Sequence, residues 1–360
     1  MRTIVPAATA TRLVAIVLLA VLPAVPAAAA DLWVFGDSNV DTGWYRVSPY
    51  SGNPSFDFDL ALSSTYGIGE PTNNPGPMSV EWLSRLLNTT TNASPANQGG
   101  GNYATSGAKN VDVNTSANGG FPNAVPTVTQ IANFIDAHPR RSVAQDVVVV
   151  DSGANDITYA TSSLSGFSSA QQTAYLTARA NNLAAAVKIL HLRGTPHIIV
   201  VGQPESFGTS AEQSARQVYD TSLKRALDSK HVRYAWADAD QVRKDLIAHP
   251  ETFGIVHTSN AAGDVACSSP DPVLGIDTAW ALLCSASSPV SRPTAFADAT
   301  LFADDQHWSA QAQSALGTYL FCLAVTSWPQ LRPAPPRRGL PPPRTRLPFP
   351  CDSFSEFSTR

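Results

Sequence analysis

LWVFGDS, residues 32–38, is a short apolar run that ends abruptly in turn-forming residues. Runs of this length that are apolar on both faces are typical of parallel strands buried inside a sheet. Three further runs of the same character predict three further strands: Val147 to Val150, His197 to Val201 and Val232 to Trp236. The chain therefore carries the strands of a buried parallel sheet.

Longer segments with helical periodicity lie between and after these runs. They cover residues 79–87, 128–137, 171–192, 212–229, 240–248 and 309–325. Strands that alternate with helices of this length form right-handed βαβ units, which leave a parallel sheet covered on both faces. The sequence thus predicts an α/β fold. Residues 31–327 contain no repeat or linker that would divide them, so we expect one domain.

The N-terminal residues 1–30 have the layout of a signal peptide. Arg2 and Arg12 precede the apolar run from Leu13 to Leu22, and the small residues up to Ala30 offer cleavage sites. We expect secretion into the periplasm or the medium after cleavage near Ala30. The run is shorter than the roughly 20 apolar residues of a membrane span, and we expect no transmembrane segment in the mature chain.

The C-terminal residues 328–360 are rich in proline and arginine, which predicts a disordered tail. The chain also has four cysteines. Exported proteins form disulfides, and a bridge between Cys267 and Cys284 would close a modest loop, although four cysteines allow three connectivities. Cys322 lies in an apolar helical segment, where a buried thiol is the simpler expectation.

The composition excludes several classes of partner and cofactor. The formal net charge is −4 at pH 7 and the charges form no long single-sign runs, so nothing recommends nucleic acid as a partner. The sequence has neither the Cys and His clusters of a zinc site nor the His-Glu-x-x-His pattern of a metallohydrolase. We therefore expect neither a metal nor an organic cofactor.

Ser38 follows the first predicted strand, so it would face the crevice at the carboxyl ends of the strands. By itself it is equally typical of a turn or a helix cap. Asp304 precedes His307 by three residues, just before the last helical segment. This spacing lets a carboxylate orient an imidazole as in a catalytic triad, although a capping Asp and a surface His have the same pattern.

Two further positions offer hydrogen-bond donors for an oxyanion. Gly107 can present a backbone N–H, and Asn155 follows the second predicted strand and can add a side-chain amide. The structural alternatives are a turn with positive φ for Gly107 and a helix cap for Asn155.

Taken in order, these blocks resemble the GDSL or SGNH family of esterases, lipases and acylhydrolases. The matching residues are Gly36-Asp37-Ser38, Gly107, Gly153-x-Asn155-Asp156 and Asp304-x-x-His307. The resemblance implies a flavodoxin-like three-layer α/β/α sandwich. It also implies that Ser38 is the nucleophile, that His307 and Asp304 complete the triad, and that Ser38, Gly107 and Asn155 donate to the oxyanion.

Two positions depart from this resemblance, and a third adds to it. Asn39 stands where the family name places leucine, at a position that we expect to carry no chemistry. Asp305 offers a second carboxylate beside Asp304, although the three-residue spacing favours Asp304. Asp41 resembles an acidic position that follows the nucleophile in the family, and we expect it to support the structure.

The resemblance implies two-step acyl transfer through an acyl-enzyme on Ser38. The expected activity is hydrolysis of lipid or simple carboxylic esters by a secreted enzyme. The open alternatives are an acyltransferase that uses the same acyl-enzyme, a carbohydrate esterase, and an inactive binding module on the same scaffold. An α/β-hydrolase is disfavoured because the sequence contains no Gly-x-Ser-x-Gly elbow.

Overall fold

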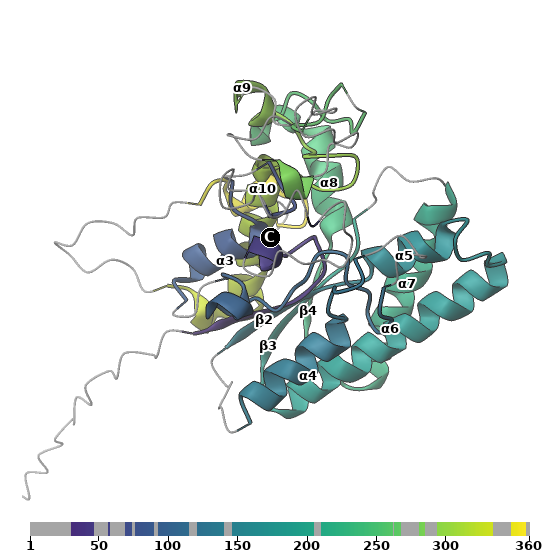
Figure 1. Cartoon of the computed structure of the whole chain (residues 1–360). Coiled ribbons are helices and arrows are strands. Elements are labelled where there is room, and N and C mark those ends of the chain that lie inside the picture. The colour runs from purple at the N-terminus through teal and green to yellow at the C-terminus, as the bar shows by residue number, and fades with distance from the viewer. Residues whose placement is uncertain are drawn as a thin grey trace, which may run out of the picture.

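A computed structural model describes residues 30–46, 57, 69–73, 76–89, 93–114, 121–139, 146–204, 210–261, 263–267, 281–284, 294–333 and 347–357. Among these residues, four parallel strands form one sheet in the order β1-β2-β3-β4 (Figure 1). They are β1 Leu32–Gly36, β2 Val147–Asp151, β3 His197–Val201 and β4 Ala235–Ala237. Residues 1–29 of the predicted signal peptide lie outside the described residues.

Alternate residues of each strand pack on opposite faces of the sheet, which explains why the strands are apolar apart from Asp151 and His197 at their ends. In β1, Leu32 and Val34 belong to one hydrophobic cluster, whereas Trp33 and Phe35 belong to the other. The first cluster is covered by α3 Ser79–Leu87, α8 Ala239–Ala248 and α10 Ala310–Ser327. The second is covered by α4 Thr127–Ala137, α5 Ala154–Thr161, α6 Ser169–Leu192 and α7 Ser210–Ser229 (Figure 1). The predicted three-layer α/β/α fold is confirmed.

Short helices complete the described structure. They are η1 Trp44–Arg46, η2 Ala96–Gln98, η4 Pro250–Phe253, η5 Ala281–Leu283, α9 Thr294–Ala297, η6 Pro329–Leu331 and η7 Cys351–Ser353. Within the described ranges, every helix is too short or too polar to span a lipid bilayer.

β4 begins three residues later than predicted, because the preceding residues finish a helix. His231 adopts a positive φ of 52°, and the backbone N–H of Val232 donates to the carbonyl of Leu227 at 3.1 Å. Both features are typical of a helix C-terminus. Val232 therefore caps α7, and the strand starts at Ala235.

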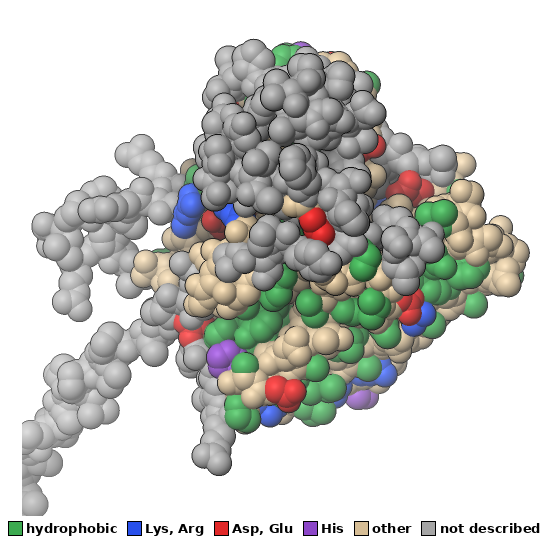
Figure 2. All heavy atoms as spheres, viewed as in Figure 1, with side chains coloured by type: hydrophobic (Ala, Val, Ile, Leu, Met, Phe, Trp, Pro, Cys, Tyr) green, Lys and Arg blue, Asp and Glu red, His purple; other side chains and the backbone are tan. Residues whose placement is uncertain are grey.

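The outer surface over α4 and α6 is partly apolar. Figure 2 shows hydrophobic side chains gathered there. A shallow groove of about 560 Å³ lies between the two helices, and its lining includes Val128, Ile135 and Ile189. Ile189 remains 50% exposed.

Residues 347–357 belong to the folded domain, which corrects the expectation that all of residues 328–360 form a disordered tail. Phe354 is fully buried, and Phe349 and Phe357 are at most 9% exposed. All three join the hydrophobic cluster that contains α10. The apolar aromatic residues near the end of the chain outweigh its high proline and arginine content, because their burial ties this segment to the core. We call residues 347–357 the C-terminal strap.

All four cysteines are paired. The predicted bridge between Cys267 and Cys284 is present. The second disulfide joins Cys322 on α10 to Cys351 in the C-terminal strap. Cys322 is therefore not the free buried thiol that the apolar helix suggested.

Candidate active site

The carboxyl ends of the strands meet at a small cavity of about 50 Å³. Its described lining includes Ser38 after β1, Asn155 after β2 and His307 just before α10. A larger cavity of about 790 Å³ lies around His197, at the amino end of β3, and its described lining includes none of the predicted site residues. The structure thus brings three of the five predicted residues together around the small cavity.

The end of β1 is held so closely that only glycine fits before the Asp37-Ser38 turn. A Cβ atom on Gly36 would lie 1.9 Å from the carbonyl oxygen of Asp151. On the other side, Gln130 of α4 binds both backbone groups of Gly36, with N–O distances of 2.9 and 2.8 Å. These contacts fix the place at which the chain leaves the sheet toward Ser38.

Asp37 joins the Ser38 turn to the helix that carries Asn155. Its carboxylate is fully buried and accepts hydrogen bonds from the backbone N–H groups of Asn39 at 3.1 Å and Gly153 at 3.3 Å. Gly153 is the N-cap residue of α5. Burial raises the pKa of Asp37 to about 6. One side chain therefore sets the position of the nucleophile relative to a predicted oxyanion donor.

Asp304 orients the imidazole of His307. The His307 Nδ1 atom lies 2.8 Å from Asp304 Oδ2 and 3.0 Å from Oδ1. The carboxylate also accepts from the backbone N–H groups of Gln306 at 2.9 Å, His307 at 2.6 Å and Ala281 at 2.8 Å. Because an ionised carboxylate only accepts, Nδ1 carries a proton, and Nε2 of the neutral ring is left as the basic atom.

Asp304 and His307 each favour the charged form of the other. Burial acts to raise the pKa of Asp304 and to lower that of His307, but their mutual attraction and hydrogen bond outweigh it. As a result, the pKa of Asp304 lies below its usual value and the pKa of His307 lies above its own. Asp305 is exposed, and it is Asp304 that bonds the ring. The geometry favours Asp304 as the acid of a triad.

Asn155 connects α5 to the loop that contains Gly107. Its Nδ2 atom donates to the carbonyl of Ala108 at 3.0 Å. An amide nitrogen carries two protons, so Asn155 retains a second N–H for a ligand in the cavity that it lines. This arrangement suits a donor to an oxyanion.

Gly107 is explained by its local surroundings. Its φ is 82°, and a Cβ atom there would lie 2.8 Å from Cδ2 of Phe121. Both observations correspond to the structural alternative of a turn that requires glycine. Gly107 is not among the described residues that line the cavity. Its part as an oxyanion donor stays a prediction.

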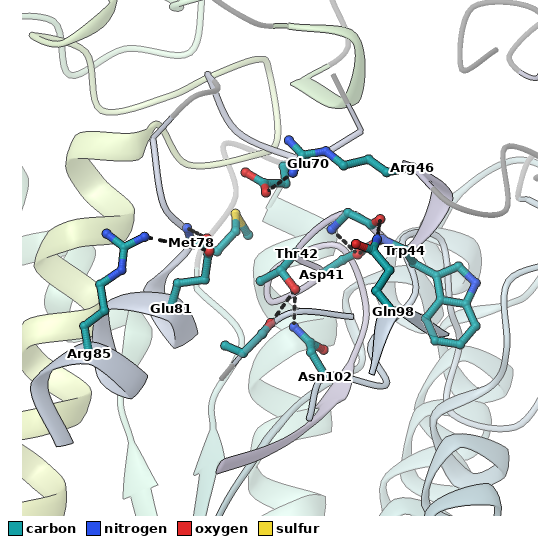
Figure 3. Close-up of polar contacts among 12 residues, drawn as sticks. Asp41, Thr42, Trp44, Arg46, Glu70, Met78, Glu81, Arg85, Gln98 and Asn102 are labelled. Carbon is teal, nitrogen blue, oxygen red and sulfur yellow. Dashed lines mark hydrogen bonds and ion pairs between the residues drawn. The ribbon is translucent and has the colours of Figure 1, made fainter. Parts of the chain in front are cut away.

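Asp41 holds the loop after Ser38, in the supporting position expected for it. Its Oδ1 accepts from the backbone N–H groups of Gly43 at 2.9 Å and Trp44 at 2.8 Å (Figure 3). Its Oδ2 accepts from the N–H and the hydroxyl of Ser106, at 2.8 and 2.6 Å. Since Ser106 precedes Gly107, Asp41 ties the nucleophile loop to the loop of the predicted second donor.

A second set of hydrogen bonds holds the residues on either side of Asp41. The Thr42 hydroxyl donates to the carbonyl of Ala93 at 2.6 Å (Figure 3). The Asn102 amide donates to that hydroxyl at 3.0 Å and to the carbonyl of Val40 at 2.7 Å. All four residues are buried, so these bonds are shielded from water and fix residues 40–42 firmly.

Two lining residues escaped prediction from the sequence. Asn39, expected to carry no chemistry, lines the cavity, and its Nδ2 lies 3.4 Å from both Asp151 Oδ1 and Gln203 Oε1. Gln203 also lines the cavity and is only 2% exposed. Its position two residues after β3, at the carboxyl end of a predicted strand, was the signal that could have identified it.

No group of three or more His, Cys, Asp or Glu side chains is placed to hold a metal ion in the part of the chain that the structure describes. A model of the GDSL-like Lipase/Acylhydrolase family matches residues 32–320. A search of curated proteins finds no match. The matched range contains every residue of the predicted site, from Ser38 to His307.

Proposed function

Because this chain belongs to the GDSL-like lipase/acylhydrolase family and is therefore an ester-hydrolysing enzyme, we propose that it is a secreted hydrolase that cleaves carboxylic esters through an acyl-enzyme on Ser38. The observation that carries this proposal is the pairing of His307 with Asp304 at the cavity that Ser38 lines. The two disulfides support export, since such bonds persist in oxidising compartments.

The proposed reaction proceeds in two steps. The Ser38 hydroxyl attacks the ester carbonyl while His307 Nε2 takes its proton, and Asp304 stabilises the imidazolium that forms. The backbone N–H groups of Ser38 and Gly107 and the amide of Asn155 bind the oxyanion. His307 then protonates the departing alcohol, and water, activated by His307, hydrolyses the acyl-enzyme.

The shape and polarity of the cavity support a short acyl group. Its volume of about 50 Å³ leaves little room for a long chain. Beyond the predicted catalytic residues, its described lining is mostly polar: Asn39, Thr158, Gln203, Glu212, Arg216 and Gln306, beside Ala154, Ile157 and Pro204. Such a wall suits simple short-chain esters, and it keeps esters of hydroxylated alcohols such as carbohydrates as the second candidate.

A serine-reactive fluorophosphonate and a series of p-nitrophenyl esters test this proposal. We expect one adduct, on the peptide that contains Ser38, and faster turnover of the acetate and butyrate than of the palmitate. Ser38→Ala should lose both labelling and turnover. Activity that survives in Ser38→Ala would refute the acyl-enzyme. Product analysis with an added alcohol separates hydrolysis from acyl transfer.

The amide of Asn155 allows a test of the oxyanion site. We expect Asn155→Ala to lower kcat about 10²- to 10³-fold with a small change in KM, because the lost bond forms fully only in the transition state. Steady-state kinetics on p-nitrophenyl acetate measure this. Asn182→Ala, an exposed position on α6, is the matched control. A loss confined to KM would contradict the assignment.

A further inference from the structure

The two residues next to Ser38 in the chain both form hydrogen bonds with residues at the carboxyl end of β2. Before it, Asp37 accepts from the backbone of Gly153. After it, the side-chain amide of Asn39 reaches the carboxylate of Asp151, the last residue of β2. The turn that holds the nucleophile is thus attached on both sides of the serine.

Gln203 completes the attachment from β3. Its Nε2 donates to Asp151 Oδ1 at 3.0 Å, the same oxygen that Asn39 approaches at 3.4 Å. Its Oε1 lies 3.4 Å from Asn39 Nδ2, so the two amides also bind each other. The side chains of Asn39 and Gln203 on Asp151 form what we call the amide clamp.

The backbone of Gln203 is itself fixed by α7. Its N–H donates to Asp220 Oδ1 at 3.3 Å, and its carbonyl accepts from Arg216 Nη1 at 2.8 Å. All four polar groups of Gln203 are therefore engaged. A residue held this firmly can determine the position of its partners.

Asp151 needs the clamp because it is buried among acidic neighbours. It is 1% exposed, and burial followed by the nearby charge of Asp37 places its pKa well above the usual value. Asp220 adds to this effect, whereas the bonds from Gln203 and Asn39 oppose it. Removing an amide would leave a buried carboxyl oxygen with fewer partners, which favours a shift of the loop that carries Ser38.

We propose that Asn39 and Gln203 are positioning residues: the amide clamp holds Ser38 in register with His307 and the oxyanion donors. The proposal rests on the role of Ser38 given above. The leucine that the family name places after the serine has no amide and cannot bind Asp151. In this chain, hydrogen bonds therefore connect the residue after Ser38 to the carboxyl ends of β2 and β3.

The test compares Asn39→Leu, Gln203→Met and the double variant with the wild-type protein. Both replacements keep the approximate size of the side chain and remove the amide. We expect kcat and the rate of fluorophosphonate labelling of Ser38 to fall about tenfold or more in each single variant, with KM within about twofold, because small misplacements of a nucleophile are costly. The double variant should fall by much less than the product of the two losses, since both residues act on one carboxylate.

Asn182→Leu, at an exposed position on α6 that is not among the described residues lining the cavity, is the control and should retain wild-type kinetics. Circular dichroism and thermal midpoints verify folding. Should a variant not fold, Asn39→Ser or Gln203→Asn replaces it, because each ends short of the carboxylate.

Three results would overturn the clamp. The first is a single variant whose labelling rate and kcat stay within about twofold of wild type. The second is a single variant in which only KM rises, which would make the two amides substrate contacts, and the third is a double variant whose loss equals the product of the two single losses. In each case wild-type labelling at Ser38 would leave the proposed function standing. If the wild-type protein is not labelled at Ser38, the proposed function fails and the clamp falls with it.

Discussion

Asp304→Asn should lower kcat about 10⁴-fold, whereas Asp305→Asn should leave it within about twofold. The reason is the tautomer of His307. Asp304 Oδ1 accepts from two backbone N–H groups, so an asparagine keeps its oxygen there and turns its amide toward His307 Nδ1. The ring must then accept at Nδ1 and carry its proton on Nε2, where it can no longer take a proton from Ser38.

The pH dependence of the residual activity gives an independent readout. His307 acts as a base only when neutral, so activity falls as the pH drops through its pKa. In the native protein the charge of Asp304 raises that pKa. Asp304→Asn removes the charge, and the acid limb of kcat/KM should move to lower pH. Equal losses in Asp304→Asn and Asp305→Asn would show that the assignment of the triad acid is wrong.

Removal of residues 347–360 should lower the thermal midpoint by at least about 10 °C. The truncation exposes the surface that Phe349, Phe354 and Phe357 cover, and each buried aromatic contributes about 1.5–3 kcal/mol. It also removes the Cys322–Cys351 disulfide, typically worth about 2–4 kcal/mol. Together these losses are comparable to the whole stability of an ordinary domain, about 5–15 kcal/mol.

Differential scanning calorimetry measures the decrease in the thermal midpoint. Two further variants separate the contributions of the disulfide, the aromatic residues and the last three residues. Cys322→Ala combined with Cys351→Ala keeps the aromatic residues and should show a smaller decrease than the truncation. Removal of residues 358–360 alone should leave the midpoint nearly unchanged. A truncated protein as stable as the full chain would mean that the strap contributes nothing to the core.

The sequence predicts those features that depend on residues close together in the chain. The apolar runs at β1, β2 and β3 predict strands because both of their faces are buried. The spacing of Asp304 and His307 likewise indicates their contact, since residues three apart in a tight bend lie close together.

What the sequence did not reveal depends on contacts between distant segments. The bonds between Asn39, Asp151 and Gln203 join the ends of three strands, and no local pattern marks them. α5 was missed because its eight residues bury only a few positions. The C-terminal strap was missed because average composition conceals three well-placed aromatic side chains.

The strap also has a consequence for biosynthesis. Phe354 lies against Phe253 and Tyr319, so the core that these earlier residues begin is complete only after the strap has been synthesised. The nascent chain cannot reach its final stability while the strap is still in the exit tunnel. A nascent chain that stops before the strap therefore lacks part of the core of this domain and not a separate appendage.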